Sequence, residues 1–273
     1  MKQATYESII LVIDECEFDF DQILAQIIKK FPDISPVLLR SILSLEYQRR
    51  IKKNFYRHST PQDKKRLYDK FVKRVRAGDP PGVIVQLAKA NKFAPALIGR
   101  SILESSLSDN YSKNQISDFG KYTSLVEDRD LAYEVFLANV KDEMYGSFSN
   151  SIRHCIGAEY EQLVKNNLKK LDIAFLDEND LRDRGYDKTP DVKLEVPIAV
   201  NGTIINWIES KALFGDKKSH KGYLDDQLWS YWNRFGPGLV IYWFGFIDEL
   251  NDLETGKILL SDSFPENITY FKP

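Results

Sequence analysis

The sequence predicts an α+β protein of two domains: an all-α domain over residues 1–126 and an α/β domain over residues 127–273. Apolar residues recur with helical spacing through the first range, whereas the alternation typical of strands is confined to the second. The polar stretch 109–130, which contains Gly120, has little sustained period and is the expected junction. A length of 273 residues also exceeds what most single cores hold.

The all-α domain is expected to contain helices joined by tight connections. Ile23 and Ile27 keep the helical period, and Pro32 marks the break before the next apolar run. The tetrapeptide Arg-Ser-Ile-Leu at 40–43 recurs at 100–103, again after a short connection. We interpret both regions as helix-turn-helix-like units, a motif that places its second helix on a DNA duplex. Short helical pairs also occur as plain scaffolding, so the motif alone does not establish DNA binding.

A strongly basic segment lies between these two units. From Arg40 to Arg76 there are thirteen Lys and Arg residues against three acidic residues, although the whole chain has a net charge of −2. A concentrated basic surface on an otherwise acidic protein is typical of polyanion binding, whereas a solvated helix face without a ligand is the alternative. The residues expected to contact nucleic acid are Arg49, Arg50, Lys52, Lys53, Arg57, Lys64, Lys65, Arg66, Lys73, Arg74 and Arg76.

The α/β domain is expected to hold a β-hairpin followed by a helix and a buried strand. Apolar residues alternate from Val192 to Val200, and Asn201-Gly202 is the strongest short-range hairpin signal. Residues 239–246 are almost entirely apolar, as in a strand covered on both faces. In chain order, the expected elements are helices over 131–144 and 152–171, strands over 173–176, 192–200 and 203–211, a helix over 223–235, and a strand over 239–246.

Two short motifs on the arms of this hairpin carry the candidate chemistry. Thr189-Pro190-Asp191 places an acid at the start of the first arm, and Glu209-Ser210-Lys211 places an acid and an amine at the end of the second. One carboxylate from each arm can share a hard divalent cation, and the amine beside them can hold and polarise a water molecule. An isolated acid-x-lysine triplet is common and usually structural, but the two motifs together indicate a phosphodiester-hydrolysing site.

The element order and these motifs resemble the PD-(D/E)xK nuclease superfamily. The resemblance implies an αβββαβ nuclease core with a mixed sheet. Gly157-x-x-x-Glu161 looks like the opening helix of archaeal Holliday-junction resolvases within that superfamily, and Gln227-x-x-x-Tyr231 resembles an accessory motif of its RecB-like members.

Three longer stretches, 185–191, 207–212 and 229–243, resemble the codanin-1-interacting nuclease family. We identify the chain as a member of that family from these stretches. The resemblance implies codanin-1 as the protein partner and a location in the nucleus and cytoplasm.

The resemblance also implies a role for each site residue. Asp191 and Glu209, with the main-chain carbonyl of Ser210, are expected to bind Mg²⁺ or Mn²⁺, because these ions prefer oxygen ligands. Glu161 is expected to be a further ligand or a water acceptor, and Glu159, which lies on a different face of the same helix, is the alternative.

Lys211 and Gln227 complete the expected catalytic set. Lys211 is expected to position the attacking water and to stabilise negative charge, with a pKa that depends on burial and on the nearby carboxylates. Gln227 is expected to orient the phosphate or the lysine. The expected catalytic residues are therefore Glu161, Asp191, Glu209, Lys211 and Gln227.

The hairpin register presents a geometric difficulty for this site. If Asn201-Gly202 closes a regular two-residue hairpin, Asp191 faces Ala212 and lies on the opposite sheet face from Glu209. A one-residue bulge would move Asp191 to the same sheet face as Glu209. Pro197, which has no N–H to donate to the ladder, is the natural place for this bulge. We therefore predict a bulge or break near Pro197, or else a bend that takes Asp191 out of the strand.

The composition restricts the compartment, and three functional hypotheses remain. Cys16 and Cys155 are the sole cysteines, which favours a reducing compartment, and no apolar run has the length of a membrane span. The leading hypothesis is a metal-dependent endonuclease acting on branched or flapped DNA. The alternatives are a nuclease fold used chiefly as an adaptor for codanin-1, and a non-catalytic DNA-binding protein.

Overall fold

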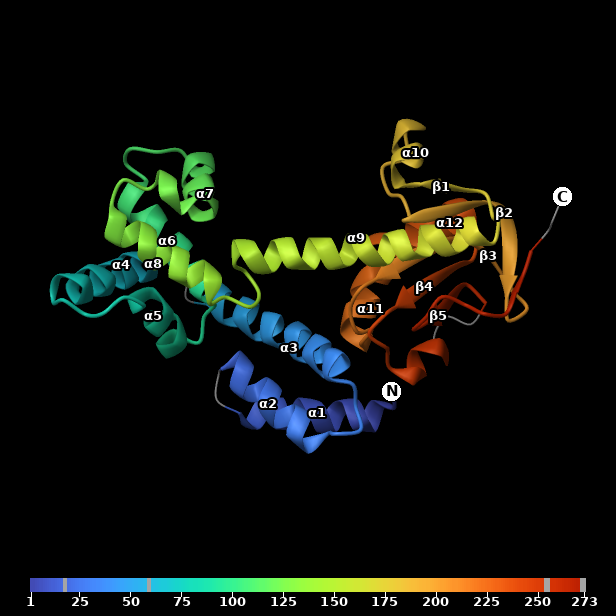
Figure 1. Ribbon diagram of the computed structural model, residues 1–273, viewed down its shortest axis with the longest axis horizontal. Helices are drawn as coiled ribbons and strands as arrows, with labels where there is room; N and C mark the ends of the chain where they lie inside the picture. Colours follow the sequence, from blue (N-terminus) through green and yellow to red (C-terminus); the bar gives the residue numbers. More distant parts are fainter. Residues whose placement is uncertain (17–18, 58–59, 253–255, 271–273) are drawn as a thin grey trace. The chain divides into compact units, whose positions relative to one another are not determined.

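The computed structural model describes residues 1–16, 19–57, 60–252 and 256–270 and has the α+β composition expected from the sequence (Figure 1). Its packing divides the chain into two units that interleave in sequence. A sheet unit comprises Met1–Asp14, Lys30–Ile42 and Cys155–Pro273, and a helical unit comprises Glu15–Lys29 and Leu43–His154. Residues 127–154 therefore pack with the helices that precede them in the chain. The functional division at residue 126 stays a prediction.

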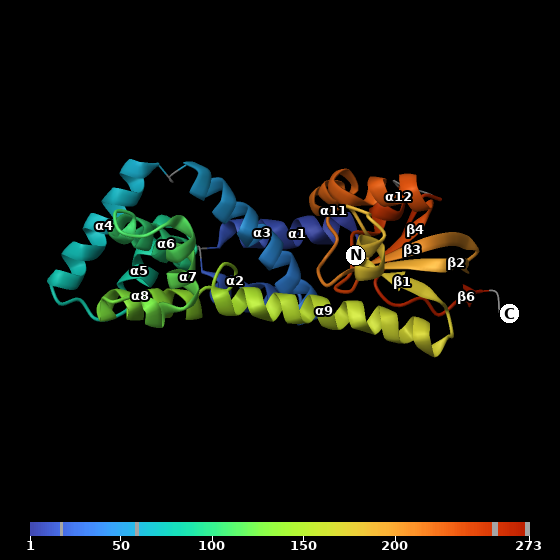
Figure 2. The same ribbon diagram turned by 90° about the horizontal axis from the view of Figure 1, so that it is seen from above.

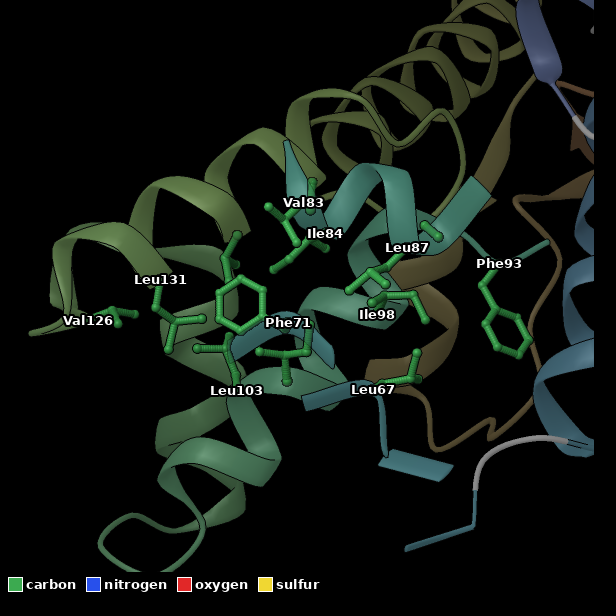
Figure 3. Packing of buried hydrophobic residues seen from close by; sticks show 14 of the residues in the cluster. Leu67, Phe71, Val83, Ile84, Leu87, Phe93, Ile98, Leu103, Val126 and Leu131 are labelled. Atoms are coloured by element: carbon green, nitrogen blue, oxygen red, sulfur yellow. The ribbon is translucent and has the colours of Figure 1, made fainter. Parts of the chain in front are cut away.

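The helical unit is built from helices, and buried residues between Leu67 and Ala138 form one apolar core. Its elements are α2 (Phe20–Lys30), most of α3 (Pro36–Arg57), α4 (Pro61–Arg76), α5 (Val83–Asn91), α6 (Pro95–Leu107), α7 (Lys113–Lys121), the 3₁₀ turn η1 (Thr123–Leu125), α8 (Arg129–Val140) and the start of α9 (Ser147–Lys170). Figure 3 shows Phe71 of α4, Ile84 of α5, Leu103 of α6 and Leu131 of α8 pointing into this core. None of the described helices is both long enough and apolar enough to cross a bilayer.

Local sequence signals and buried acids together explain where these helices begin. α4 starts with a capping box in which Thr60 and Asp63 satisfy each other's backbone N–H groups. α5 is preceded by Gly82, which has no side chain to cap it. Instead, the buried carboxylate of Glu134 accepts hydrogen bonds from the N–H groups of Gly82 and Ile84, at 2.6 and 3.0 Å. A negative charge at a helix N-terminus is stabilising, so α8 holds α5 in place.

The sheet unit contains a mixed sheet with the order β1-β2-β3-β4-β5, and β6 pairs with the free edge of β2. The first three strands are antiparallel, and β3, β4 and β5 are parallel. The elements are α1 (Gln3–Glu15), the C-terminal part of α9, β1 (Phe175–Asp177), α10 (Glu178–Asp183), β2 (Val192–Val200), β3 (Thr203–Lys211), α11 (Lys217–Tyr223), the π-helical segment η2 (Leu224–Leu228), α12 (Trp229–Phe235), β4 (Gly238–Tyr242), the 3₁₀ segment η3 (Asp248–Asp252), β5 (Ile258–Ser261) and β6 (Ile268–Thr269).

Helices cover both faces of this sheet, as Figure 2 shows for α9 and α12. Val164 and Leu168 of α9 pack in one apolar cluster with residues of β2, β3 and β4. On the other face, the fully buried ring of Trp207 meets Tyr231 of α12 edge to face, with 5.4 Å between ring centroids. A Cβ at Gly238 would lie 2.0 Å from the Trp207 ring, so only glycine fits there.

The expected hairpin is confirmed, including the irregularity in its register. β2 and β3 have the predicted bounds, and Val200 pairs with Thr203 across the turn. The pairing then shifts between Lys193 and Ile198, a stretch that includes Pro197, and Val192 pairs with Ile208. If the pairing of Val192 with Ile208 is extended by one residue, Asp191 lies opposite Glu209. The predicted bulge therefore places the two acids on the same face.

Candidate active site

Two acidic side chains meet where β2 begins and β3 ends. The Asp191 carboxylate accepts a hydrogen bond from the backbone N–H of Ser210 at 2.7 Å. The backbone N–H of Asp191 donates in turn to the Glu209 carboxylate at 3.3 Å. Each acid is thus fixed by the main chain of the opposite strand. The Glu209 residue is only 4% exposed and Asp191 is half-buried, so two carboxyl groups face each other with little access to water.

Lys211 supplies the positive charge of this site. Its Nζ donates to Glu209 Oε1 at 2.6 Å and to Gln227 Oε1 at 3.2 Å, and it lies 4.8 Å from the centroid of the Tyr223 ring. Burial opposes protonation of the amine, but the Glu209 carboxylate outweighs that effect and raises the pKa of Lys211 above its usual value. The amine is therefore an ammonium group at neutral pH.

Gln227 reaches the site from an interruption in a helix. It belongs to η2, where the helical hydrogen bonds widen to the π pattern between α11 and α12. Such π segments are rare and are found frequently at functional sites. The sequence predicts one uninterrupted helix over 223–235; the structure has three consecutive helical segments that begin earlier, at Lys217.

A divalent cation fits the charge and chemistry of this site. Burial and the nearby Glu209 carboxylate raise the pKa of Asp191 well above its ordinary value, because one ammonium group does not offset two close acids. The available donors are oxygens, as Mg²⁺ and Mn²⁺ prefer. The Ser210 hydroxyl accepts a hydrogen bond from the Trp243 ring N–H at 2.9 Å. In the same loop as Asp191, the buried Thr189 hydroxyl has no hydrogen-bond partner among the described residues.

Glu161 lies on α9, within electrostatic reach of the acid pair. Burial raises the pKa of Glu161, and the carboxylates of Glu178 and Glu209 contribute to the rise. Across the described ranges, however, no three acidic, histidine or cysteine side chains converge closely enough to form a metal cluster. Asp191 and Glu209 are therefore the centre of the site, and the role of Glu161 as a direct ligand stays a prediction.

The basic residues expected to contact nucleic acid fall into two groups. Some are engaged within the helical unit: Arg49 and Arg50 pair with Glu46, Lys64 pairs with Glu104, and Arg74 pairs with Asp79. Others are exposed to solvent, namely Lys52, Lys53, Lys65, Arg66, Lys73 and Arg76, together with Lys70. The side chain of Arg57 lies outside the described part of the chain. On α4, Lys65, Arg66, Lys70 and Lys73 line one surface depression.

Two residues that contact this site or its loop, Tyr223 and Arg234, are not among the site residues expected from the sequence. Tyr223 lies against the Lys211 amine, and its position four residues before Gln227, on one side of a helical turn, was an available signal. Arg234 binds the loop that leads to Asp191. It belongs to the stretch 229–243, but no pattern in the sequence indicates its partners because they lie in an irregular loop.

Comparisons with known proteins identify close relatives along nearly the whole chain. A family model described as "Protein of unknown function TPD sequence-motif" matches residues 127–264. Proteins named "CDAN1-interacting nuclease 1" match from Xenopus laevis (44% identical, 98% of this chain and 89% of the relative), Homo sapiens (45%, 90% and 89%) and Danio rerio (40%, 98% and 90%). No solved structure matches.

Proposed function

Because the chain belongs to the CDAN1-interacting nuclease 1 family, we propose that it is a metal-dependent endonuclease that hydrolyses phosphodiester bonds of branched or flapped DNA. The observation that carries this proposal is the facing pair of half-buried Asp191 and buried Glu209, with the Lys211 ammonium 2.6 Å from Glu209. An abandoned site has no physical reason to keep two acids together in a dry environment, since close burial of like charges is unfavourable. The same pair and amine, aligned by a register shift, are what the PD-(D/E)xK resemblance implies.

Asp191, Glu209 and the Ser210 carbonyl would hold the Mg²⁺ or Mn²⁺ ion, which supplies positive charge to the scissile phosphate. Lys211 stays protonated and does not act as a base. Glu209 and Gln227 accept two of its three hydrogens, so the third is donated to the attacking water, and the positive charge of the ammonium stabilises developing negative charge. Gln227 fixes the direction of the Lys211 amine by accepting one of its hydrogens. Glu161, whose pKa is raised, accepts a hydrogen bond from the water.

The proposal is tested by incubating the protein with labelled linear, flap, fork and four-way DNA, and with the matching RNA strands. Each substrate is incubated with Mg²⁺, with Mn²⁺ or with EDTA. We expect endonucleolytic products from branched or flapped DNA with either cation and none with EDTA. Intact substrate under all cation conditions, or cleavage that survives EDTA, would contradict the proposal.

We assign DNA binding to the exposed cations of α4, because Arg49 and Arg50 of α3, like Lys64 and Arg74 of α4, already pair with acids. Lys65 and Lys73 lie eight residues apart, on the same side of the helix and at the same depression. Lys65→Gln/Lys73→Gln is expected to lower duplex affinity and to reduce the slope of log K against log salt by about two, one for each lost phosphate contact.

Fluorescence anisotropy in EDTA measures this affinity without cleavage. The control is Lys169→Gln/Lys170→Gln, which removes the same charge from exposed positions at the end of α9. An equal loss for the two variants would mean that net charge, and not the α4 surface, governs binding.

An exposed aromatic cluster favours a second function, that of binding a protein partner. The cluster consists of Tyr133 and Phe136 on α8 and Phe148 on α9. Val140 and Ile152 follow Phe136 and Phe148 by one helical turn, and all five residues are between 40% and 59% exposed. Phe136 meets the Phe148 ring edge to face at 6.3 Å. A contiguous exposed apolar surface marks an interaction site. Because the relatives are named for an interaction with CDAN1, we assign this cluster to codanin-1. The nucleus and cytoplasm, which the family resemblance implies, are the compartments that we propose for the complex.

Phe136→Ser/Phe148→Ser is expected to weaken codanin-1 binding at least tenfold, since buried aromatic anchors dominate interface energies. Because both side chains are exposed, cleavage activity and thermal stability should stay near the wild-type values. Pull-down and titration with purified codanin-1 measure the effect, and Leu11→Ser, which alters an exposed apolar residue of the sheet unit, is the control. Unchanged affinity in the double variant would reject this surface.

A further inference from the structure

The loop that delivers Asp191 has little regular structure of its own. Residues 184–191 connect α10 to β2 and contain neither helix nor strand. The N–H of Asp191 is hydrogen-bonded to a side chain, that of Glu209, and not to a backbone carbonyl. The position of this catalytic acid therefore depends on how the preceding residues are attached.

Arg234 of α12 provides that attachment. Its Nη1 donates to the Lys188 carbonyl at 3.0 Å and its Nη2 to the Asp187 carboxylate at 2.5 Å. The guanidinium carbon lies 6.0 Å from the centroid of the Tyr186 ring, and that ring packs edge to face on Phe235. One planar side chain thus contacts three consecutive residues of the loop, a geometry that the guanidinium fork provides and a lysine does not.

The same loop is also linked to the segment that carries Gln227. The Lys188 ammonium donates to the carbonyl of Asp226, which immediately precedes Gln227 in η2. Gln227 binds Lys211, and Lys211 binds Glu209. Arg234 and Lys188 therefore join the loop of Asp191 to the helix that orients the other half of the site.

We propose that Arg234 is a positioning residue: it clamps residues 186–188 to α12 and so sets the place of Asp191 relative to Glu209 and Lys211. This inference rests on the proposed nuclease function. The Arg234 and Asp187 side chains are 35% and 73% exposed, and an ion pair so accessible to water contributes little to global stability. The Arg234–Asp187 ion pair instead affects the position of Asp191. A displacement of about 1 Å at a catalytic group lowers the rate by about 10²-fold.

Arg234→Ala is expected to lower kcat by about 10- to 100-fold and to raise the Mn²⁺ concentration for half-saturation several-fold. KM for DNA should change less than about twofold, because Arg234 touches the loop and not the α4 surface. Arg234→Lys is expected to recover only part of the activity, since an ammonium group cannot contact the Lys188 carbonyl and the Asp187 carboxylate as a planar fork does.

Cation binding is measured separately from cleavage, by the shift of the melting temperature with added Mn²⁺ and by Mn²⁺ paramagnetic resonance. The control is Lys2→Ala, which removes another exposed ion pair of the sheet unit, that with Asp248, and should leave kcat and Mn²⁺ binding unchanged. Arg234→Ala with wild-type kcat and Mn²⁺ affinity would overturn the proposal. So would a loss of activity matched by a large fall in melting temperature, because that result indicates a purely structural role.

The two proposals fail in different ways. A wild-type protein that binds Mn²⁺ but cuts no substrate contradicts the nuclease proposal, and the clamp is then judged from Mn²⁺ affinity alone. A wild-type protein that neither binds Mn²⁺ nor cuts overturns both.

Discussion

Asp191→Asn is expected to reduce cleavage by at least about 10³-fold while making the cation-free protein more stable. The amide keeps an oxygen to accept the hydrogen bond from Ser210, so the local geometry is retained. Without a bound cation, the negative charge of Asp191 is unfavourable because of burial and the nearby Glu209, as its raised pKa shows. Relief of about 1 kcal/mol would raise the melting temperature by about 2–4 °C in a chain of this size.

The pH dependence of this stabilisation follows from the same pKa shift. A carboxyl group with a raised folded pKa binds more protons in the native state, so the wild-type protein loses stability as pH rises from the unfolded pKa through the folded one. The stability gain of Asp191→Asn should therefore be largest above the folded pKa and vanish below the unfolded pKa.

Calorimetry in EDTA and with Mn²⁺, together with the cleavage assay, measures these effects. Glu195→Gln, the same acid-to-amide change at an exposed position of β2, is the control and should alter neither activity nor the Mn²⁺ response. An Asp191→Asn protein that is less stable than the wild type in EDTA would show that the negative charge of Asp191 is not unfavourable in the cation-free protein. One that still cuts at a comparable rate would show that Asp191 is not a catalytic metal ligand.

Lys211→Met is expected to abolish cleavage and also to destabilise the sheet unit. Lys211 and Glu209 form a largely buried pair, with side chains 14% and 5% exposed. Removing one partner of such a pair costs about 3–5 kcal/mol, because an uncompensated charge stays buried. Since a bound cation replaces the missing positive charge, Mn²⁺ should raise the melting temperature of Lys211→Met more than that of the wild type.

Because Lys211→Met can unfold part of the protein, Lys211→Arg is the informative second variant. It keeps a positive charge beside Glu209 and should keep the fold, but the guanidinium cannot hold the water where the ammonium does. Circular dichroism and single-turnover cleavage separate the two effects. If Lys211→Arg cleaves DNA at the wild-type rate, positive charge alone suffices and the proposed positioning of water is wrong.

The hairpin and its irregularity could be predicted because their signals are local. Alternating apolar residues define the strand limits, Asn201-Gly202 defines the turn, and Pro197 cannot take part in a regular ladder. The requirement that two acids meet on one sheet face then predicts the register shift. Where periodicity, turn chemistry and site geometry agree, the sequence determines structure over a short range.

Features that depend on distant contacts could not be predicted. β5 and β6 have four and two residues, too few for a periodic pattern, and the strand expected over 239–246 ends at Tyr242. From the sequence, Arg49 and Lys64 are expected to contact nucleic acid. In the fold they form ion pairs with Glu46 and Glu104 instead. The interleaving of the two units likewise follows from tertiary packing and not from local composition.

The central claim is that Asp191 and Glu209 together bind one catalytic divalent cation. A crystal grown with Mn²⁺ tests it most directly, through the anomalous difference density at the manganese absorption edge. We expect one strong peak about 2.0–2.2 Å from a carboxylate oxygen of each acid, a distance typical of hard divalent cations of this size, and no such peak in Asp191→Asn. Manganese bound elsewhere on the protein, with no density between these two acids, would contradict it.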